Sequence, residues 1–189
     1  MSCIAKTPVF PVSSTLKNGK TLVIRRMQPD DLAAYSRVTA LGYQETRFLT
    51  RGPEDPPIPA EALLEFIHET MNSDREILLA ASYEGEVVGF ADLTACSNRK
   101  KFSHRCELSL CVLKDYWSLG IGRALTTALI DFACGAGYEQ VELCVAGDNE
   151  RAIGLYQSLA FHDTGRQPHA MKHGEGDYSD WVFMTRFLH

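Results

Sequence analysis

Two glycines stand at the start of the clearest helical pattern in the chain, in the segment DYWSLGIGRALTTALIDFA. Gly120 and Gly122 overlap a run of apolar residues spaced three and four positions apart: Ile121, Ala124, Leu125, Ala128, Leu129, Phe132 and Ala133. This spacing predicts one apolar face of a helix that ends near Gly135. Glycine disfavours a helix by ~1 kcal/mol relative to alanine, so we expect the glycines to let something lie against the backbone. Since the free N–H groups of a helix start bind anions, the segment predicts a phosphate cradle.

The known phosphate loops match this segment incompletely. A Walker loop needs Lys followed by Ser or Thr, and Arg123-Ala124 does not supply them. A dinucleotide-binding loop needs a third glycine, where Leu125 stands. The glycines alone therefore leave an alternative open, namely a turn that only lets the helix pack closely.

Strand and helix patterns alternate along the chain. Period-two or continuous apolar runs predict strands at 21–25, 77–83, 86–95, 104–113, 140–146, 161–171 and 178–188. Helical spacing predicts helices from Asp30 or Asp31 to about 41, and at 60–72, 121–135 and 149–160, with a proline-rich loop at 50–59. This order predicts an α/β (α+β) fold with a mixed sheet and helices on both faces. Residues 1–20 are expected to form an N-terminal extension and 21–189 a single domain.

Composition excludes several classes of protein. A net charge of -5 argues against a nucleic-acid binder, because phosphate backbones require a basic face. The N-terminus lacks the apolar core of a signal peptide, and no apolar run is long enough to span a membrane. The six cysteines show no CxxC spacing and are expected to be free, buried thiols in the reducing cytoplasm. No metal is expected, since His169 and His173 lie between Pro168 and Gly174 and lack the glutamate of a helical metal motif.

Two motifs in fixed order resemble those of the GCN5-related N-acetyltransferase superfamily. The run Trp117-Ser118-Leu119-Gly120-Ile121-Gly122 is similar to the family's loop Gln/Arg-x-x-Gly-x-Gly/Ala, with Trp117 as a departure at the first position. The downstream segment NERAIGLYQSLAF, residues 149–161, matches the family's Asn, Ala and Leu-Tyr positions, with Ala160 replacing a glycine. With similar segments at both ends, the resemblance covers almost the whole chain.

The resemblance implies a single domain with a twisted, mostly antiparallel sheet of about seven strands. It implies acetyl-coenzyme A as cosubstrate, with the pantetheine arm paired to Leu110, Cys111 and Val112. The residues it implies for the rest of the cofactor are Leu119, Gly120, Ile121, Gly122, Arg123, Asn149 and Tyr156.

The chemistry of acetyl transfer to an amine requires a base for the ammonium proton and a donor for the oxyanion. Alternation along HRCELSLCV places Glu107, Ser109 and Cys111 on one face of a strand. Glu107 is the candidate base, and a glutamate paired with Arg105 or Arg123 is the alternative; His104 is a rival base. The resemblance implies Tyr156 as the acid and an amide near Val112 as the oxyanion donor, although Tyr156 also fits a core position.

The sequence identifies the acceptor of the acetyl group less closely than it identifies the cofactor. Glu45 on the first helical region, with Tyr178 and Asp180 on the last strand, are expected to shape the substrate site, and ordinary surface or packing roles are the alternative. Three functions remain open: an N-acetyltransferase for a small-molecule amine or amino acid, a protein N-terminal acetyltransferase, and a non-catalytic acyl-coenzyme A sensor. Related proteins suggest a possible homodimer.

Overall fold

An eight-stranded sheet forms the centre of the structure, a computed structural model that describes residues 8–188. Its strand order is β1-β2-β3-β4-β5-β6-β8-β7. The strands are β1 Val12–Thr15, β2 Thr21–Arg26, β3 Ile77–Tyr83, β4 Glu86–Ala95, β5 Arg105–Val112, β6 Gln140–Ala146, β7 His162–Gly174 and β8 Asp177–Phe187. Only β5 and β6 pair in parallel, which confirms the mixed, mostly antiparallel sheet. The additional strand β1 lies within the expected N-terminal extension and pairs with β2.

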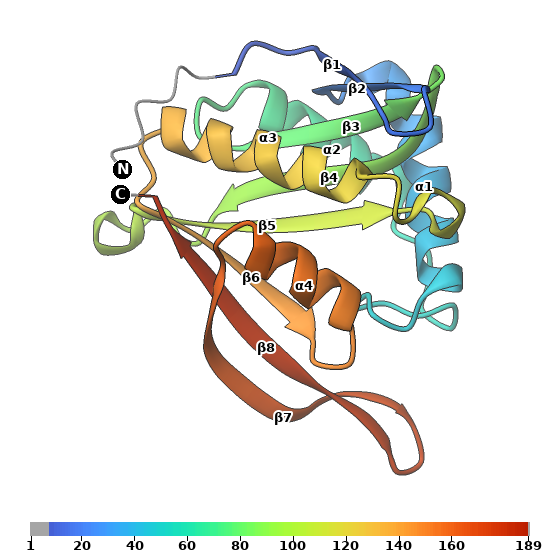
Figure 1. Cartoon of the computed structure of the whole chain (residues 1–189), viewed down its shortest axis with the longest axis vertical. Coiled ribbons are helices and arrows are strands. Elements are labelled where there is room, and N and C mark those ends of the chain that lie inside the picture. Colours follow the sequence, from blue (N-terminus) through green and yellow to red (C-terminus); the bar gives the residue numbers. More distant parts are fainter. Residues whose placement is uncertain (1–7, 189) are drawn as a thin grey trace.

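Four helices cover the two faces of the sheet, as predicted (Figure 1). They are α1 Leu32–Glu45, α2 Ala60–Met71, α3 Ile121–Gly135 and α4 Glu150–Ser158. The helices α3 and α4 lie on one face, and α1 and α2 lie on the other. The proline-rich segment 50–59 joins α1 to α2 without helix or strand, as its composition predicts.

The core forms two separate layers because the sheet is apolar on both faces. On β3, Leu79 packs with α3 while its neighbour Leu78 packs with α1 and α2, since successive strand residues point to opposite faces. Helix α2 packs on the second of these layers. Thr70 is buried, whereas Met71 is 39% exposed, because the face that α2 turns to the sheet passes through Leu63, Ile67 and Thr70.

The pairing of β5 with β6 is short. It covers only Arg105–Glu107 against Gln140–Glu142, whereas β5 remains paired with β4 through Val112. Beyond Glu107 the two strands diverge, as Figure 1 shows. The opening is therefore lined by strand backbone on one side and by the start of α4 below it.

The cysteines differ from the expectation of buried, free thiols. Cys96, Cys106, Cys111 and Cys144 are free, but only Cys106 and Cys111 are buried and Cys144 is exposed. The expectation is wrong for Cys134, which is disulfide-bonded. Cys3 lies outside the described residues. Across residues 8–188, no helix combines the length and the apolar character that crossing a membrane requires.

Asp31 fixes the entry into α1 differently from the expected helix cap. It occupies the N-cap position, but its side chain makes no cap hydrogen bond. Its carboxylate instead accepts two hydrogen bonds from the Arg25 guanidinium on β2, at 2.6 and 2.7 Å, and one from the backbone N–H of Gln28 at 2.9 Å. The hydrogen bonds from Arg25 contribute most to holding the pKa of Asp31 below its usual range, and the bond from Gln28 adds to them. Together these bonds tie the start of α1 to the sheet.

We expect Asp31→Asn to lower the free energy of unfolding by about 1–2 kcal/mol, because hydrogen bonds to charged groups contribute on that scale. Since folding lowers the pKa of Asp31, its contribution is present above the carboxyl's ordinary pKa and is lost as the pH falls through the lowered value. Urea denaturation at neutral and acidic pH measures both effects. Asp30→Asn, at an exposed neighbour, is the control, and equal losses for the two variants would contradict the prediction.

Candidate active site

A cleft of about 590 Å³ occupies the place where β5 and β6 diverge. It brings together segments that are far apart in the sequence: residues 107–112 of β5, the loop that leads into α3, residues 144–146 of β6, the first turns of α4, and the region from α1 into the following loop. Of the predicted site residues, the lining includes Glu107, Leu110, Cys111, Val112, Gly120, Gly122, Arg123, Asn149 and Tyr156. Leu119 and Ile121 are not among the lining residues, and their side chains pack into the core.

The backbone of β5 presents unpaired groups to this cleft. Hydrogen bonds from Leu113 N to Val88 O (3.0 Å) and from Cys96 N to Arg105 O (3.2 Å) show that the odd-numbered residues of β5 pair with β4. In an antiparallel ladder the intervening residues point the other way. Leu110 and Val112 therefore direct their backbone N–H and C=O groups into the gap that β6 leaves. The Trp117 Nε1 donates to Val112 O at 2.6 Å, which leaves the Val112 N–H facing the cleft.

The loop before α3 adds a second set of free N–H groups. Gly120 is the N-cap of the helix, with no side-chain cap bond, and the first helical bond runs from Ala124 N to Gly120 O. The N–H groups of Ile121, Gly122 and Arg123 thus have no partner within the helix. Gly120 has a φ of +94°, and Ser118 has a φ of +63°. The positive φ is the reason why glycine is favoured at position 120. A Cβ there would meet no protein atom within 4 Å, so the backbone faces open space on this side.

The second glycine has a different role. A Cβ on Gly122 would lie 3.3 Å from the Leu155 side chain of α4, so this glycine allows α3 and α4 to approach closely beside the cleft. Gly122 therefore accounts for close packing of the two helices, one of the two alternatives that the sequence left open. The free N–H groups that follow Gly120 are available for the other alternative, the anion cradle, which stays a prediction.

Two arginines border the cradle. Arg123 donates to Ser158 Oγ at 2.7 Å, and Arg151 lies with its guanidinium 3.6 Å from the centre of the Trp117 ring. The family pattern has Gln or Arg at the position of Trp117. Trp117 carries no charge itself, but its ring binds the guanidinium cation of Arg151. Both arginines line the cleft and add positive charge beside the free N–H groups.

Glu107 lies on the cleft wall with an exposed side chain. The pKa of Glu107 is raised mainly by partial burial and also by the nearby Glu142 carboxylate. The partners that the sequence left open for it are engaged elsewhere: Arg105 binds Glu142 at 2.5 and 2.6 Å, and Arg123 binds Ser158. Glu107 therefore has the raised pKa and the access to solvent that a general base needs.

Tyr156 is 7% exposed on α4 and packs edge-to-face against Phe161, with ring centres 5.7 Å apart. It also lines the cleft, so its position is compatible with the predicted role as the acid as well as with a place in the core. Burial raises the pKa of Tyr156, which keeps its hydroxyl protonated at neutral pH. Asn149, on the same element, caps α4 by accepting a hydrogen bond from Ala152 N at 3.2 Å.

The three residues expected at the acceptor site do not line the cleft. The Glu45 carboxylate accepts a hydrogen bond from Lys114 N at 2.7 Å and so fixes the turn after β5. Tyr178 stacks on His169 with ring centres 4.8 Å apart. Asp180 accepts a hydrogen bond from His169 N and pairs with Arg166. Glu107, Glu45 and Asp180 therefore do not converge on one acceptor.

Other residues, which sequence reasoning missed, form the wall opposite the cradle. They are Thr39, Tyr43, Phe48, Leu49, Phe90 and Trp181. Most are aromatic or aliphatic, and they come from α1, the loop after it, β4 and β8. No local motif marks them; Phe48 and Leu49 directly precede the proline-rich loop, which is a weak signal, and the other four have none.

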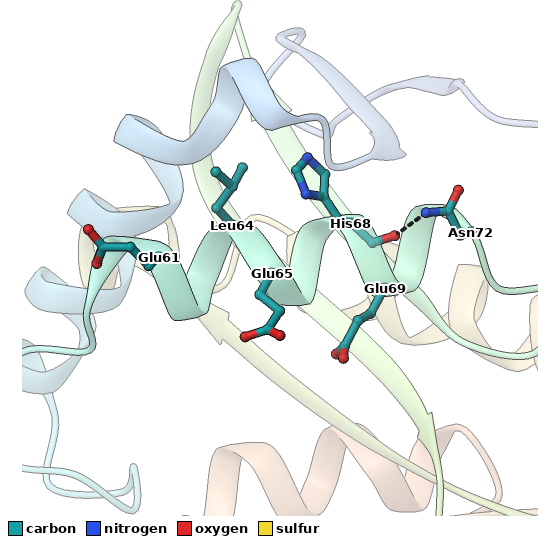
Figure 2. Close-up of a pocket in the computed structure, with 6 residues that line it drawn as sticks. All are labelled: Glu61, Leu64, Glu65, His68, Glu69 and Asn72. Carbon is teal, nitrogen blue, oxygen red and sulfur yellow. Dashed lines mark hydrogen bonds between the residues drawn. The ribbon is translucent and has the colours of Figure 1, made fainter.

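A second hollow lies on the outer face of α2 and is lined by Glu61, Leu64, Glu65, His68, Glu69 and Asn72 (Figure 2). All six residues belong to this helix and the residue that caps it, and Asn72 bonds back to the His68 carbonyl at 3.0 Å. It joins no other element. The cleft between β5 and β6 is therefore the candidate active site.

Comparison with known proteins places this geometry in one family. The sequence profile of the acetyltransferase (GNAT) family matches residues 43–161, more than half of the chain, so the chain belongs to that family. An acetyltransferase of the GNAT family from Streptococcus pneumoniae is 28% identical, with a TM-score of 0.83, over 88% of this chain and 99% of that one. The structure of yncA from Salmonella typhimurium with acetyl-CoA shares the fold, at 24% identity and a TM-score of 0.79 over 89% and 94% of the two chains.

Among curated relatives, the L-amino acid N-acyltransferase MnaT of Escherichia coli is 31% identical over 91 residues. That match covers 48% of this chain and 53% of the relative. Across three curated relatives, the matched region covers between 30% and 53% of the relative's length.

We expect Gly120→Ala to weaken the binding of coenzyme A about tenfold, because a Cβ strains the positive φ and moves the free N–H groups. Gly137→Ala is the matched control, since Gly137 has a φ of +77° at the other end of α3, outside the cleft. Both variants are expected to lose about 1 kcal/mol of stability. Calorimetry with coenzyme A distinguishes them, and unchanged affinity in Gly120→Ala would exclude the cradle.

Proposed function

We propose that the protein is an acetyl-CoA-dependent N-acetyltransferase that moves the acetyl group to a primary amine by direct attack. One observation carries this proposal: the unpaired backbone of β5, the free N–H groups of α3 and the accessible Glu107 carboxylate share one cleft. The first two features fit the pantetheine amides and the pyrophosphate of acetyl-CoA. Arg123 and Arg151 add positive charge for its phosphates.

The residues of the cleft supply each proton and charge that the reaction requires. Glu107 removes a proton from the bound ammonium, and the neutral nitrogen attacks the thioester carbonyl. As the C–N bond forms, the Val112 N–H donates a hydrogen bond to the developing oxyanion. The C–S bond then breaks, and the hydroxyl of Tyr156 protonates the leaving thiolate. The second amine proton leaves the nitrogen and restores Tyr156, so the net release is the one proton held by Glu107.

A bridge over the acceptor end of the cleft favours a small molecule over a peptide. Arg47, in the loop after α1, forms ion pairs with Asp177 of β8 at 2.7 Å and with Asp148, after β6, at 3.7 Å. The residues on both sides of Arg47, Thr46 and Phe48, line the cleft, as does Trp181 of β8. The ion pairs of Arg47 thus connect two walls of the cleft. An extended peptide would have to pass through the space that these ion pairs occupy.

The direct test of this function is the release of free thiol from acetyl-CoA in the presence of small amines, amino acids and short peptides. Stimulation by small amines supports the proposal. Stimulation by peptides alone would indicate the protein N-terminal activity. Tight binding of acetyl-CoA without transfer to any acceptor would indicate a sensor.

We expect Glu107→Gln to lower kcat about a hundredfold or more, because general base catalysis typically contributes 10²–10⁴-fold. In the wild type, kcat/KM is expected to rise with pH through the raised pKa of Glu107, since only the ionised carboxylate accepts a proton. The variant should lose this step while its affinity for coenzyme A is unchanged. Glu65→Gln, on the outer face of α2, is the control; a Glu107 variant that retains full activity would exclude Glu107 as the base.

We expect Arg47→Ala to raise the relative kcat/KM for bulky acceptors about threefold or more, because loss of the bridge widens the acceptor end. The control is Arg166→Ala, which removes another exposed ion pair of the β7–β8 hairpin, outside the cleft. Competition between a small amine and a short peptide measures the ratio. An unchanged ratio would show that the bridge does not limit acceptor size.

A further inference from the structure

Asp92 is a half-buried carboxylate that the proposed reaction does not use. It lies on β4 directly opposite Ser109 of β5, and its Oδ1 accepts a hydrogen bond from Ser109 Oγ. Ser109 and Glu107 line the cleft, whereas Asp92, beside Ser109 on the neighbouring strand, is not among the lining residues. Ser109 therefore contacts both the Asp92 carboxylate and the cleft, and its hydroxyl lies between the two.

The direction of this hydrogen bond determines what Ser109 can offer to a ligand. A serine hydroxyl has one proton and two lone pairs. Because its proton points to Asp92, the lone pairs of Ser109 Oγ remain for a donor in the cleft. Glu107, two residues away on the same face of β5, offers further acceptor oxygens. An alkylammonium group carries three N–H donors and matches this arrangement.

The surroundings of Asp92 make its charge sensitive to pH. Burial raises the pKa of Asp92 to about 6, against the opposing effect of the Ser109 hydrogen bond. The charged groups that act on it are Glu107 of β5 and Glu76, just before β3, and both raise its pKa further. From α1, the buried Tyr35 faces Asp92 as a neutral hydroxyl. The excess of negative charge at this point is therefore balanced best by a cation in the cleft.

Thr39 of α1 provides an independent indication of a ligand on this wall. Its side chain lines the same cleft and is only 5% exposed. Its Oγ1 has no hydrogen-bond partner within the described part of the chain. A buried polar group without a partner costs about 1–3 kcal/mol, so a polar group of a bound molecule would satisfy it.

We propose that Ser109, oriented by Asp92, and Glu107 form the subsite that binds the ammonium group of the acceptor before transfer. This inference rests on the proposed function and names its acceptor class: a cationic primary amine with an apolar body. The apolar body would lie against the rings of Tyr43, Phe90 and Trp181, which line the same cleft. Asp92 is a positioning residue, because it acts through Ser109.

The test uses 2-phenylethylamine, a primary ammonium with an aromatic body, and measures its binding by calorimetry on the full chain saturated with coenzyme A. We expect the wild type to bind the probe, and Ser109→Ala and Asp92→Asn to bind it about tenfold more weakly. In the wild type, affinity should decrease as the pH falls through about 6, where Asp92 becomes protonated. Asp92→Asn should lose this step, which a purely structural role would not remove.

Asp131→Asn is the matched control, because Asp131 is another carboxylate whose pKa is raised by burial, on α3 outside the cleft. Failure of the wild type to bind the probe, or equal binding by Ser109→Ala and the wild type, would overturn the inference. Transfer to amines with no effect of either variant would overturn the inference and leave the proposed function intact. Binding through Ser109 without transfer would support the subsite and contradict the proposed function.

Discussion

The early end of the pairing between β5 and β6 is the constraint on which the site depends. Strand β6 pairs along its whole length with β8, from Gln140 to Ala146, but only over three residues with β5. The long antiparallel ladder therefore holds β6 away from β5, and beyond Glu107 the edge of β5 that faces β6 has no strand beside it, while the other edge stays paired with β4. Buried backbone groups require partners, so we infer that this gap is a binding surface.

On strand β5, the backbone groups and the side chains that face the cleft come from alternate residues. The backbone groups of the even-numbered residues face the gap, while the side chains of the odd-numbered residues Glu107, Ser109 and Cys111 face the layer of α1 and α2. In the proposed reaction, one strand thus fixes the distance between the backbone that would hold the donor and the side chains that would meet the acceptor. Rigid placement of this kind is what converts binding into productive orientation.

The sequence predicts the parts of this arrangement that depend on local patterns. The strands at 77–83, 86–95 and 140–146 agree with the structure residue by residue, and Gly120 and Asn149 both start helices at the cleft. The acceptor side depends on contacts between distant segments and was not predicted. Arg47 meets Asp177 across 130 positions, and Glu45 binds a backbone N–H of the turn after β5. No spacing along the chain encodes such contacts, so Glu45 and Asp180 were expected at the acceptor from the family resemblance and not from the residues that surround them.

The two ends of the cleft carry opposite charges, and each end suits one of the two proposed substrates. Arg123 and Arg151 lie beside the free N–H groups of α3, whereas Glu107 lies on β5, with Asp92 on the neighbouring strand β4. A polyphosphate is attracted to the first end and an ammonium to the second, although the net charge of the chain is -5. This polarity also explains why Trp117 is acceptable where the family pattern has Gln or Arg. The indole recruits Arg151 from α4 onto its face, so the cation is supplied by a different element at the same end of the cleft.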